Sequence, residues 1–318
     1  MNLRLVTCDG KTYLAPTVTE WRLRRTGGVP CDDLEAVCLF DGQLMEVLPR
    51  VYRFSAYQED TLVLRGVVDE YRAEVSERGR LLTITGRGMA ALLLDNEAEA
   101  VEYQGATVGE ILRNHAAPWG VQSGTCRDLQ CAGVYRVDSG SSQWQAVSGF
   151  TRYVGGFLPW FTADGTLQVC PMAGSGVHRS IDSTAAVTDC SVRFTRYGIL
   201  SEMLVKDKSR QTSQQVVNRE FLNLGGSRRQ VLYTPGVSTL AAMRYTGEYQ
   251  IQRSMEGTRQ VELTVAGAFA AQPGDVAWVT YPPLGLTGGY DVVEAESRGG
   301  SAGETTTLTL EERDHVDI

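Results

Sequence analysis

Hydrophobic and polar residues alternate along most of the first hundred positions, and short turn sequences separate the alternating runs. A period of two places hydrophobic side chains on one face of a β-strand, so each run predicts a strand buried on one side. Asp9-Gly10 and Asp41-Gly42 are typical hairpin turns. The predicted strands fall within residues 2–14, 18–25, 36–40, 44–48, 51–57 and 61–68. Short strands at this spacing predict a β-barrel or a β-sandwich.

The stretch LLTITGRGMAALLLDNEAE, residues 81–99, joins an alternating run to a helix-like run through Gly86, Arg87 and Gly88. The order strand, G-x-G-x-x-A, helix also occurs in phosphate-binding loops of dinucleotide-binding proteins. Those loops follow a buried parallel strand, which reads as a continuous apolar run. Here the preceding strand alternates, and with residues 67–75 and the loop SERG it forms a hairpin. The sequence therefore favours a glycine corner over a nucleotide site.

Two segments in the middle of the chain carry helix signals. Residues 107–110 (TVGE) and 142–145 (SQWQ) match the capping box, in which a hydroxyl and a Glu or Gln side chain satisfy backbone amides at a helix start. Apolar residues follow at helical spacing, and Pro118-Trp119-Gly120 and Gly155-Gly156 end the two helices. Strands at 157–161 and 166–170 come next. Residues from about 100 to 187 thus predict a small α+β domain between β-rich regions.

The last part of the chain looks all β. Alternating runs at 261–265, 276–278, 290–295 and 307–310 are separated by Gly-rich turns, and ESRGGSAGET, residues 296–305, reads as a flexible hairpin loop. This spacing fits a small closed barrel. Before it, the polar segment KDKSRQTSQQVVNRE, residues 206–220, is expected to be the most mobile stretch, together with residues 225–229.

Composition fits a globular protein with more than one domain, since the chain has 318 residues, of which 42% are hydrophobic and 21% charged. The net charge of -8 argues against a surface built to neutralise nucleic-acid phosphates, which requires clustered Lys and Arg. No apolar run approaches the roughly 20 residues of a membrane span, and the N-terminus lacks the basic-then-apolar order of a signal peptide. We therefore expect synthesis and folding in the cytoplasm.

Candidate chemical sites are sparse. The seven cysteines are irregularly spaced and are expected to be reduced thiols, and Cys126 and Cys131 with His115 upstream imitate a zinc site only loosely. His115 continues the apolar face of its helix and is interpreted as a core residue. The sequence contains no G-x-S-x-G elbow, H-E-x-x-H pair or G-K-[ST] phosphate loop. We assign no catalytic residue, no cofactor and no metal from the sequence.

Three segments, taken in order, resemble the baseplate hub family of phage tails and related contractile injection systems, the group that contains late control protein D. They are LVLRGVVDEYRAEVSERGRLLTITGRGMAALLLDNEAE, SQWQAVSGFTRYVGGFLPWFTADGTLQV and AAQPGDVAWVTYPPLGLTGGYDVVEAES, within residues 61–318. The resemblance implies a mainly β fold with an α+β insertion, in which two tube-like β-barrel domains flank a small α+β domain. The implied domains are residues 1–99, completed by 188–222, then 100–187 and 223–318.

The same resemblance implies a structural protein and no enzymatic chemistry. It implies that three chains form a pseudo-sixfold ring joining the tail tube to the central spike or tip. The implied partners are two further copies of the chain, the tail tube protein, the spike or tip protein and other baseplate proteins, with the tape measure protein as an additional candidate. DNA would pass through the lumen without specific binding. The protein would be made in the bacterial host cytoplasm and assembled into the virion tail or tail-like particle.

Five residues are candidates for subunit or partner contacts. Trp278, Tyr281 and Leu284 lie in WVTYPPLGL, where aromatic side chains and prolines at a barrel rim suit an interface. The alternative is that they close the core of their own barrel. Arg228 and Arg229 belong to a group of basic residues that could meet an acidic partner, and solvated loop charges are the alternative for them.

A second class of function stays open at this point. A wall-active glycosidase or peptidase carried on a tail scaffold would need clustered acids or a metal site in the α+β insertion. Paired acids can be recognised only by their separation in space. Asp164 and Glu110 are the residues whose substitution would test this alternative.

Overall fold

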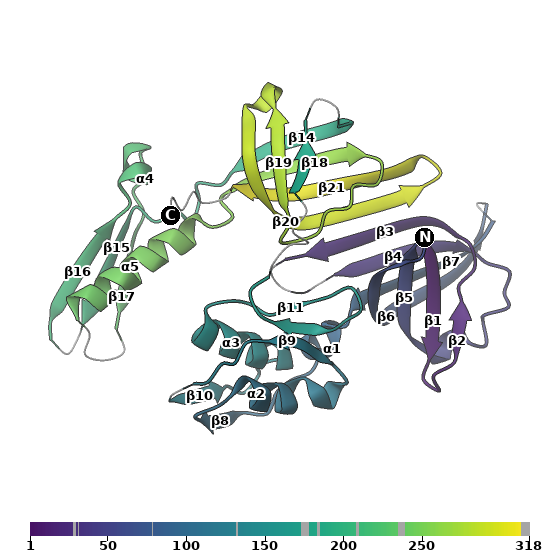
Figure 1. Cartoon of the computed structure of the whole chain (residues 1–318), viewed down its shortest axis with the longest axis horizontal. Helices are drawn as coiled ribbons and strands as arrows, with labels where there is room; N and C mark the ends of the chain where they lie inside the picture. The colour runs from purple at the N-terminus through teal and green to yellow at the C-terminus, as the bar shows by residue number, and fades with distance from the viewer. Residues whose placement is uncertain are drawn as a thin grey trace. The chain divides into compact units, whose positions relative to one another are not determined.

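The computed structural model describes all residues except 28–29, 31, 78, 132, 173–177, 183–184, 208–209, 235–238 and 313–318 (Figure 1). It is mainly β with a small α+β part, which confirms the predicted fold class. The chain divides into two compact units. The first contains Met1–Asp189 and Leu263–Thr309, and the second contains Cys190–Glu262 and the residues from Leu310 on. These boundaries are not those of the three predicted domains, and that division stays a prediction.

Strands from the start of the chain form the first β array. In spatial order they are β3 (Val18–Thr26), β4 (Asp33–Leu39), β7 (Gly79–Gly88), β6 (Thr61–Ser76), β5 (Val51–Gln58), β1 (Asn2–Thr7) and β2 (Thr12–Leu14). Their alternating apolar residues share one core, which contains Phe54 and Ile84. The strand predicted at 44–48 is wrong. Residues 43–47 form turns and Leu48–Arg50 the 3-10 helix η1, so Leu44 and Leu48 reach the core from a loop.

A second array continues the same 13-stranded sheet. In spatial order it contains β13 (His178–Ile181), β19 (Val276–Tyr281), β20 (Leu286–Gly300), β21 (Gly303–Glu312), β18 (Arg259–Ala266) and β14 (Val187–Phe194). Residues 286–291 of β20 pair with β19 and residues 294–299 pair with β3, so this one strand joins the two arrays. The loop predicted at 296–305 is wrong, because β20 continues to Gly300 and β21 begins at Gly303.

Gly86 and Gly88 lie inside β7 and not in a loop. β7 pairs with β4 on one side and with β6 on the other, and Gly86 is in register with Leu34. The backbone N–H of Gly88 donates to the carbonyl of Asp32 at 2.8 Å. The following helix, α1 (Ala91–Leu94), has only four residues. The backbone at these glycines is thus engaged in strand pairing. The predicted corner at Gly86 is wrong, because β7 continues through it and ends at Gly88, three residues before α1 begins.

Close packing explains why position 86 is glycine. A Cβ atom at Gly86 would lie 2.3 Å from the Val67 carbonyl oxygen and 2.6 Å from Cε1 of Phe54. On the neighbouring strand, a Cβ at Gly66 would lie 2.9 Å from the same ring atom. A Cβ at Gly88 would be 3.5 Å from its nearest neighbour, which is ordinary contact. The Phe54 ring therefore occupies the space that the missing side chains of Gly66 and Gly86 leave between β6 and β7.

Arg87 joins β6, β7 and the end of α1. Its Nε donates to Asp69 Oδ2 at 2.8 Å, and its Nη2 donates to Asp95 Oδ2 at 2.6 Å. Hydrogen bonds to these two carboxylates, first that to Asp69, hold the pKa of Arg87 above its ordinary value. In return, hydrogen bonding from Arg87 holds the pKa of Asp95 below its ordinary value.

The hydrogen bond between Arg87 and Asp95 leads to a prediction about how stability changes in acid. Because the pKa of Asp95 is depressed in the folded chain, its contribution is present above the unfolded pKa of about 4 and is lost as the pH falls through the folded pKa. In Asp95→Asn, we expect Tm to be lower than wild type at pH about 7 and the further fall on acidification to be smaller. Calorimetry across this pH range tests it, with the exposed Glu99→Gln as control. Identical acid dependence of Asp95→Asn and wild type would contradict the prediction.

The α+β part belongs to the first unit (Figure 1). Its larger helices are α2 (Val108–His115) and α3 (Gln143–Gly155), and its strands are β8 (Val101–Gln104), β9 (Ser123–Cys126), β10 (Val134–Val137), β11 (Trp160–Phe161) and β12 (Leu167–Val169). Both predicted helices are present. α3 buries Trp144, Val147 and Phe150, the stripe that its spacing predicts, and ends at the left-handed Gly156.

His115 is buried on α2 and both of its ring nitrogens are hydrogen-bonded. Nδ1 lies 2.8 Å from Oε1 of Gln143, and Nε2 lies 2.9 Å from the Tyr103 hydroxyl oxygen. Because an amide oxygen can only accept, Nδ1–H donates to Gln143 and the Tyr103 hydroxyl donates to Nε2. Gln143 in turn donates to the carbonyl of Glu97 at 3.0 Å. His115 is therefore a core residue that ties α2 to α3, as its place on the apolar face predicts.

The capping box of α3 gives a second prediction. The Ser142 hydroxyl accepts from the Gln145 backbone N–H at 3.1 Å, and the Gln145 side chain accepts from the Ser142 backbone N–H at 2.7 Å. Ser142→Ala leaves one helix-start amide without its acceptor, so we expect the free energy of unfolding to fall by about 1 kcal/mol. Denaturant unfolding tests this, with Ser141→Ala, one residue before the cap, as the matched control. Equal stability of the two variants would argue against the cap.

The second unit contains a three-stranded sheet and one long helix (Figure 1). The strand order is β16 (Thr212–Val217), β15 (Glu202–Asp207) and β17 (Arg229–Tyr233), and α4 (Arg219–Asn223) follows β16. α5 (Leu240–Met255) packs Met243 and Ile251 against Met203 and Val205. Residues 206–220, expected to be the most mobile stretch, contain β16, and residues 223–318, the predicted second barrel domain, contain α5. The mobility and the domain division stay predictions.

Gly247 lies in the middle of α5, a helix that the sequence analysis does not predict. Glycine lowers the helix propensity of a segment. In the structure, a Cβ at Gly247 would lie 2.5 Å from Cγ2 of Val216. The residue therefore allows the helix to approach β16 closely, and the sequence alone does not distinguish this use of glycine from a turn.

Candidate assembly surfaces

Three of the five predicted contact residues lie at one end of the β19–β20 hairpin. β19 ends at Tyr281, the 3-10 helix η3 (Pro282–Leu284) follows, and the left-handed Gly285 leads into β20. Trp278 is 50% exposed, Leu284 is 45% exposed and Tyr281 is half-buried. The alternative that Trp278 and Leu284 close their own core therefore does not hold. Their part in a contact stays a prediction.

The local sequence explains why Trp278 points outward. Alternation along β19 buries Ala277 and Val279, so Trp278 falls on the opposite face. Its cross-strand neighbour in β20 is Gly289, which has no side chain to cover the ring. Two prolines then follow, and because proline cannot donate a ladder hydrogen bond they end the strand. The result is a ring held on a rigid strand and half open to solvent.

Arg228 and Arg229 belong to the second unit. Nε of Arg229 lies 2.9 Å from Oε1 of Glu202, across the β15–β17 pair. The Arg228 guanidinium lies 5.5 Å from the centre of the Tyr197 ring, and Tyr197 is 87% exposed. The two arginines therefore have defined neighbours, in contrast to free loop charges. Binding of an acidic partner by them stays a prediction.

The second unit holds a large share of the exposed apolar surface. Among the described residues, 22 large hydrophobic side chains are exposed, and 12 of them lie between residues 190 and 262. These exposed residues are not among those predicted from the sequence to make contacts. Alternation within β16 and β17 was the sequence signal that could have indicated exposed apolar strand faces. The segment of β16 was instead expected to be mobile, and the segment of β17 was assigned to the second barrel.

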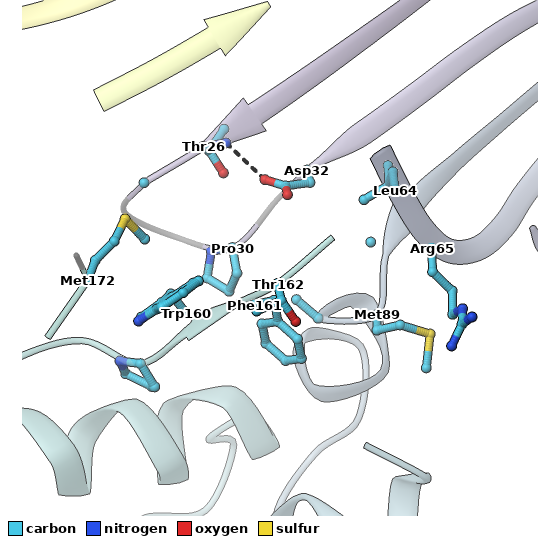
Figure 2. A pocket seen from close by; sticks show the side chains of 14 residues that line it. Thr26, Pro30, Asp32, Leu64, Arg65, Met89, Trp160, Phe161, Thr162 and Met172 are labelled. Atoms are coloured by element: carbon cyan, nitrogen blue, oxygen red, sulfur yellow. Dashed lines mark hydrogen bonds between the residues drawn. The ribbon is translucent and has the colours of Figure 1, made fainter. Parts of the chain in front are cut away.

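Figure 2 shows a small cavity in the first unit, beside Trp160 and Pro30. Its volume is about 30 Å³, which is room for about one water molecule. The backbone N–H of Thr26 donates to Asp32 Oδ1 at 2.9 Å, and burial raises the pKa of Asp32. This cavity is too small for a metabolite, and we interpret it as a packing feature.

The structure gives no metal centre within the residues that it describes, since they contain no group of three or more His, Cys, Asp or Glu side chains suited to a metal ion. Cys126 is exposed in β9, whereas Cys131 and His115 are buried. Separately, no helix in the described part of the chain is long and apolar enough to cross a membrane.

Asp164 and Glu110 are the residues named as a test of the wall-active enzyme. Each of them has a structural role in its own turn or helix start. The Asp164 carboxylate accepts from the Thr162 hydroxyl and, at 3.2 Å, from the Thr166 backbone N–H. The Thr162 hydrogen bond is the first cause that lowers the pKa of Asp164. Glu110 lies in the first turn of α2, where its backbone N–H donates to the Thr107 hydroxyl at 3.3 Å. A lowered pKa is the opposite of what a general acid needs, so these contacts do not favour Asp164 in that role.

Solved structures of tail-related proteins are similar to this chain over most of its length. The 43 kDa tail protein of prophage MuSo2 from Shewanella oneidensis aligns with a TM-score of 0.78 and 17% identity, covering 100% of both chains. A tail protein from Neisseria meningitidis aligns with a TM-score of 0.75 and 18% identity, covering 98% of this chain and 96% of that one. No protein-family model and no curated protein sequence matches the chain.

A more distant likeness extends to secretion systems. A component of the type VI secretion system of E. coli, itself similar to T4 bacteriophage tail proteins, aligns with a TM-score of 0.56 and 11% identity, covering 95% of this chain and 75% of that one. At sequence identities this low, the likeness shows that the proteins share a fold, and it does not by itself show a shared function. The joined β arrays, the α+β part and the second unit together therefore have the fold of phage tail proteins and of related baseplate hub-like proteins.

Proposed function

We propose that this chain is a structural component of a phage tail or of a related contractile injection particle, where it serves as the hub between the tail tube and the central spike or tip. The observation that carries the proposal is the likeness to two tail proteins over essentially the whole chain. A likeness of this extent supports a role in assembly geometry, because it includes both β arrays and both compact units.

The two β arrays support a specific ring. They occur in one chain and share β20, so one chain offers two barrel-like parts. If each array occupies one position of a ring, three chains fill six positions. A ring of this kind matches a sixfold tube on one side and a threefold spike on the other, and closed cyclic symmetry is usual for protein oligomers.

The partners that follow from this role are the tail tube protein, the central spike or tip protein and other baseplate proteins, with the tape measure protein as a further candidate. The protein would be made in the host cytoplasm and become part of the particle. The acidic chain, with a net charge of -8, suits a lumen that DNA passes without binding. A positive lumenal wall in a structure of the trimer would contradict this last point.

Light scattering and electron microscopy of the purified protein over a range of concentrations test the ring. We expect the mass of three chains and a threefold particle with a central channel. Because some rings close only on a partner, the same protein is then mixed with purified tail tubes. A protein that stays monomeric and does not join the tubes would contradict the hub role.

Trp278 gives a third prediction. If the exposed ring is an interface anchor, Trp278→Asp should raise the concentration for half-maximal assembly about tenfold or more, since a buried aromatic anchor contributes about 2 kcal/mol or more. Tyr153→Asp is the matched control, because Tyr153 is an aromatic side chain that is 69% exposed on α3. Assembly that is unchanged in Trp278→Asp would remove this residue from the interface, and Tyr281→Asp tests its neighbour in the same way.

A further inference from the structure

In the described part of the second unit, α5 packs on one side of the three-stranded sheet and leaves the other side open (Figure 1). Outward residues of β15 are in register with outward residues of β16 and β17, so they form one surface, which we call the uncovered face. It contains Leu204, Lys206, Val217, Arg229, Val231 and Tyr233, together with Glu202. Val217, Val231 and Tyr233 are 39%, 43% and 50% exposed. A surface with an apolar centre is thus presented to solvent on rigid strands.

The charge of this region is opposite to that of the rest of the chain. Residues 190–262 contain 11 Lys and Arg against 6 Asp and Glu, whereas the remaining residues contain 19 against 32. On the uncovered face, Lys206 and Arg229 outnumber the one carboxylate, Glu202. An acidic partner surface with some apolar side chains is therefore complementary to this face.

Such a surface exists in the first unit. β6 pairs with β5 only over Thr61–Val67, and beyond this point it pairs with β7 alone among the described strands. Residues 69–76 are all exposed. We call residues 69–77 the acidic arm, since they contain four Asp and Glu and one Arg. Tyr71 and Val75, which alternation places on the same side, are 38% and 80% exposed.

We propose that the uncovered face of one copy binds the acidic arm of a second copy. The inference rests on the proposed function, because this contact would link neighbouring chains of the ring. The arm is an exposed strand edge, a feature that folded proteins usually cover. Its two sides differ, because the register with β7 places Tyr71 and Val75 on one side and Glu70 and Glu74 on the other. A contact between two different surfaces of identical chains is head-to-tail, and such contacts form a ring when the rotation from one chain to the next closes.

Other occupants fit less well. Two uncovered faces in symmetrical contact would bring Lys206 and Arg229 of both copies together, and like charges oppose association. A nucleic acid would need clustered cations, but the centre of the face is Leu204 and Val231, and Arg229 is already paired with Glu202.

Cross-linking between two singly substituted proteins tests the contact directly. Cys8 and Cys126, which are exposed, are first replaced by serine. In this background, Val231→Cys on the face and Val75→Cys on the arm are made in separate proteins, mixed, and treated with a short bismaleimide. We expect a covalent dimer containing one chain of each kind. Tyr249→Cys, an exposed position on α5, replaces Val231→Cys in the control and should give no such dimer.

Charge exchange tests the same contact without cross-linking. Lys206→Glu and Glu74→Lys should each raise the concentration for half-maximal self-association about tenfold, and the mixture of the two variants should recover much of the loss. Arg253→Glu, at an exposed site on α5, is the control and should not change it. Circular dichroism confirms that the variants, all at solvent-accessible sites, are folded.

The outcomes separate this inference from the ring proposal. If wild type forms the trimer but the mixed cysteine proteins do not cross-link and the charge variants assemble normally, the inference is wrong and the ring stands. If wild type does not associate even with tail tubes, both proposals fail.

Discussion

Replacement of Gly86 by alanine is expected to lower the free energy of unfolding of the first unit by about 3 kcal/mol, at the upper end of the usual cost of overpacking. The new methyl group would meet the Val67 carbonyl oxygen at 2.3 Å and the Phe54 ring at 2.6 Å. The carbonyl belongs to a paired strand, so β6 and β7 must separate locally to admit the methyl group. Relief by a side-chain rotation of Phe54 alone does not suffice, because the closest atom is in the backbone.

Gly88→Ala is the matched control for this experiment. It lies in the same strand two residues away, and its new Cβ would find its nearest neighbour at 3.5 Å. The expected change is within about 1 kcal/mol and can be stabilising, because alanine has less freedom than glycine in the unfolded chain. Urea unfolding followed by tryptophan fluorescence measures both variants. Equal stability of the two would show that the close approach at position 86 is relieved without cost.

Replacement of His115 by leucine is expected to lower the free energy of unfolding by about 3 kcal/mol. The substitution keeps the apolar contacts of α2, but it leaves the buried Gln143 amide oxygen without the donor Nδ1–H and the buried Tyr103 hydroxyl without the acceptor Nε2. Each unsatisfied buried group costs about 1–3 kcal/mol. Unfolding of purified protein in denaturant measures the effect.

Two comparisons isolate the polar contribution of this network. Asn114→Ala removes the hydrogen bond from Asn114 Nδ2 to the Tyr103 hydroxyl, but Asn114 is exposed, so the expected loss is under about 1 kcal/mol. In the double variant His115→Leu and Gln143→Leu, both partners become apolar, and the loss should be smaller than the sum of the single losses. Additive losses would mean that the cost of His115→Leu arises from packing and not from hydrogen bonds.

Much of the fold could be predicted because alternation reports one-sided burial directly. The strands around Phe54 and Ile84 and the two capped helices were predicted from local pattern, and the structure contains them. One failure arose from a glycine. Gly299 belongs to the segment predicted as a loop, but it is a site of close approach within β20, because a Cβ at Gly299 would lie 2.4 Å from Nε1 of Trp21. Whether a glycine turns the chain or admits a neighbour depends on residues far away in sequence.

The two candidate surfaces differ in how far the sequence predicts them. The exposure of Trp278 follows from its own strand, because alternation and the two prolines after Tyr281 are local signals. The uncovered face does not follow from local signals. It forms because β15 pairs in parallel with β17, and 20 or more residues separate these two strands in the sequence. The resemblance to tail hub proteins indicated the class of fold, but it did not identify which surfaces the chain leaves open.

The path of β20 has a mechanical consequence. Its first half is bonded to β19 and its second half to β3, so the two arrays share an uninterrupted backbone where a flexible linker would otherwise act as a hinge. A force along the strand direction would load several ladder hydrogen bonds in parallel, and these must break together and not one after another. The junction therefore resists sliding of the two arrays past each other along the strand direction.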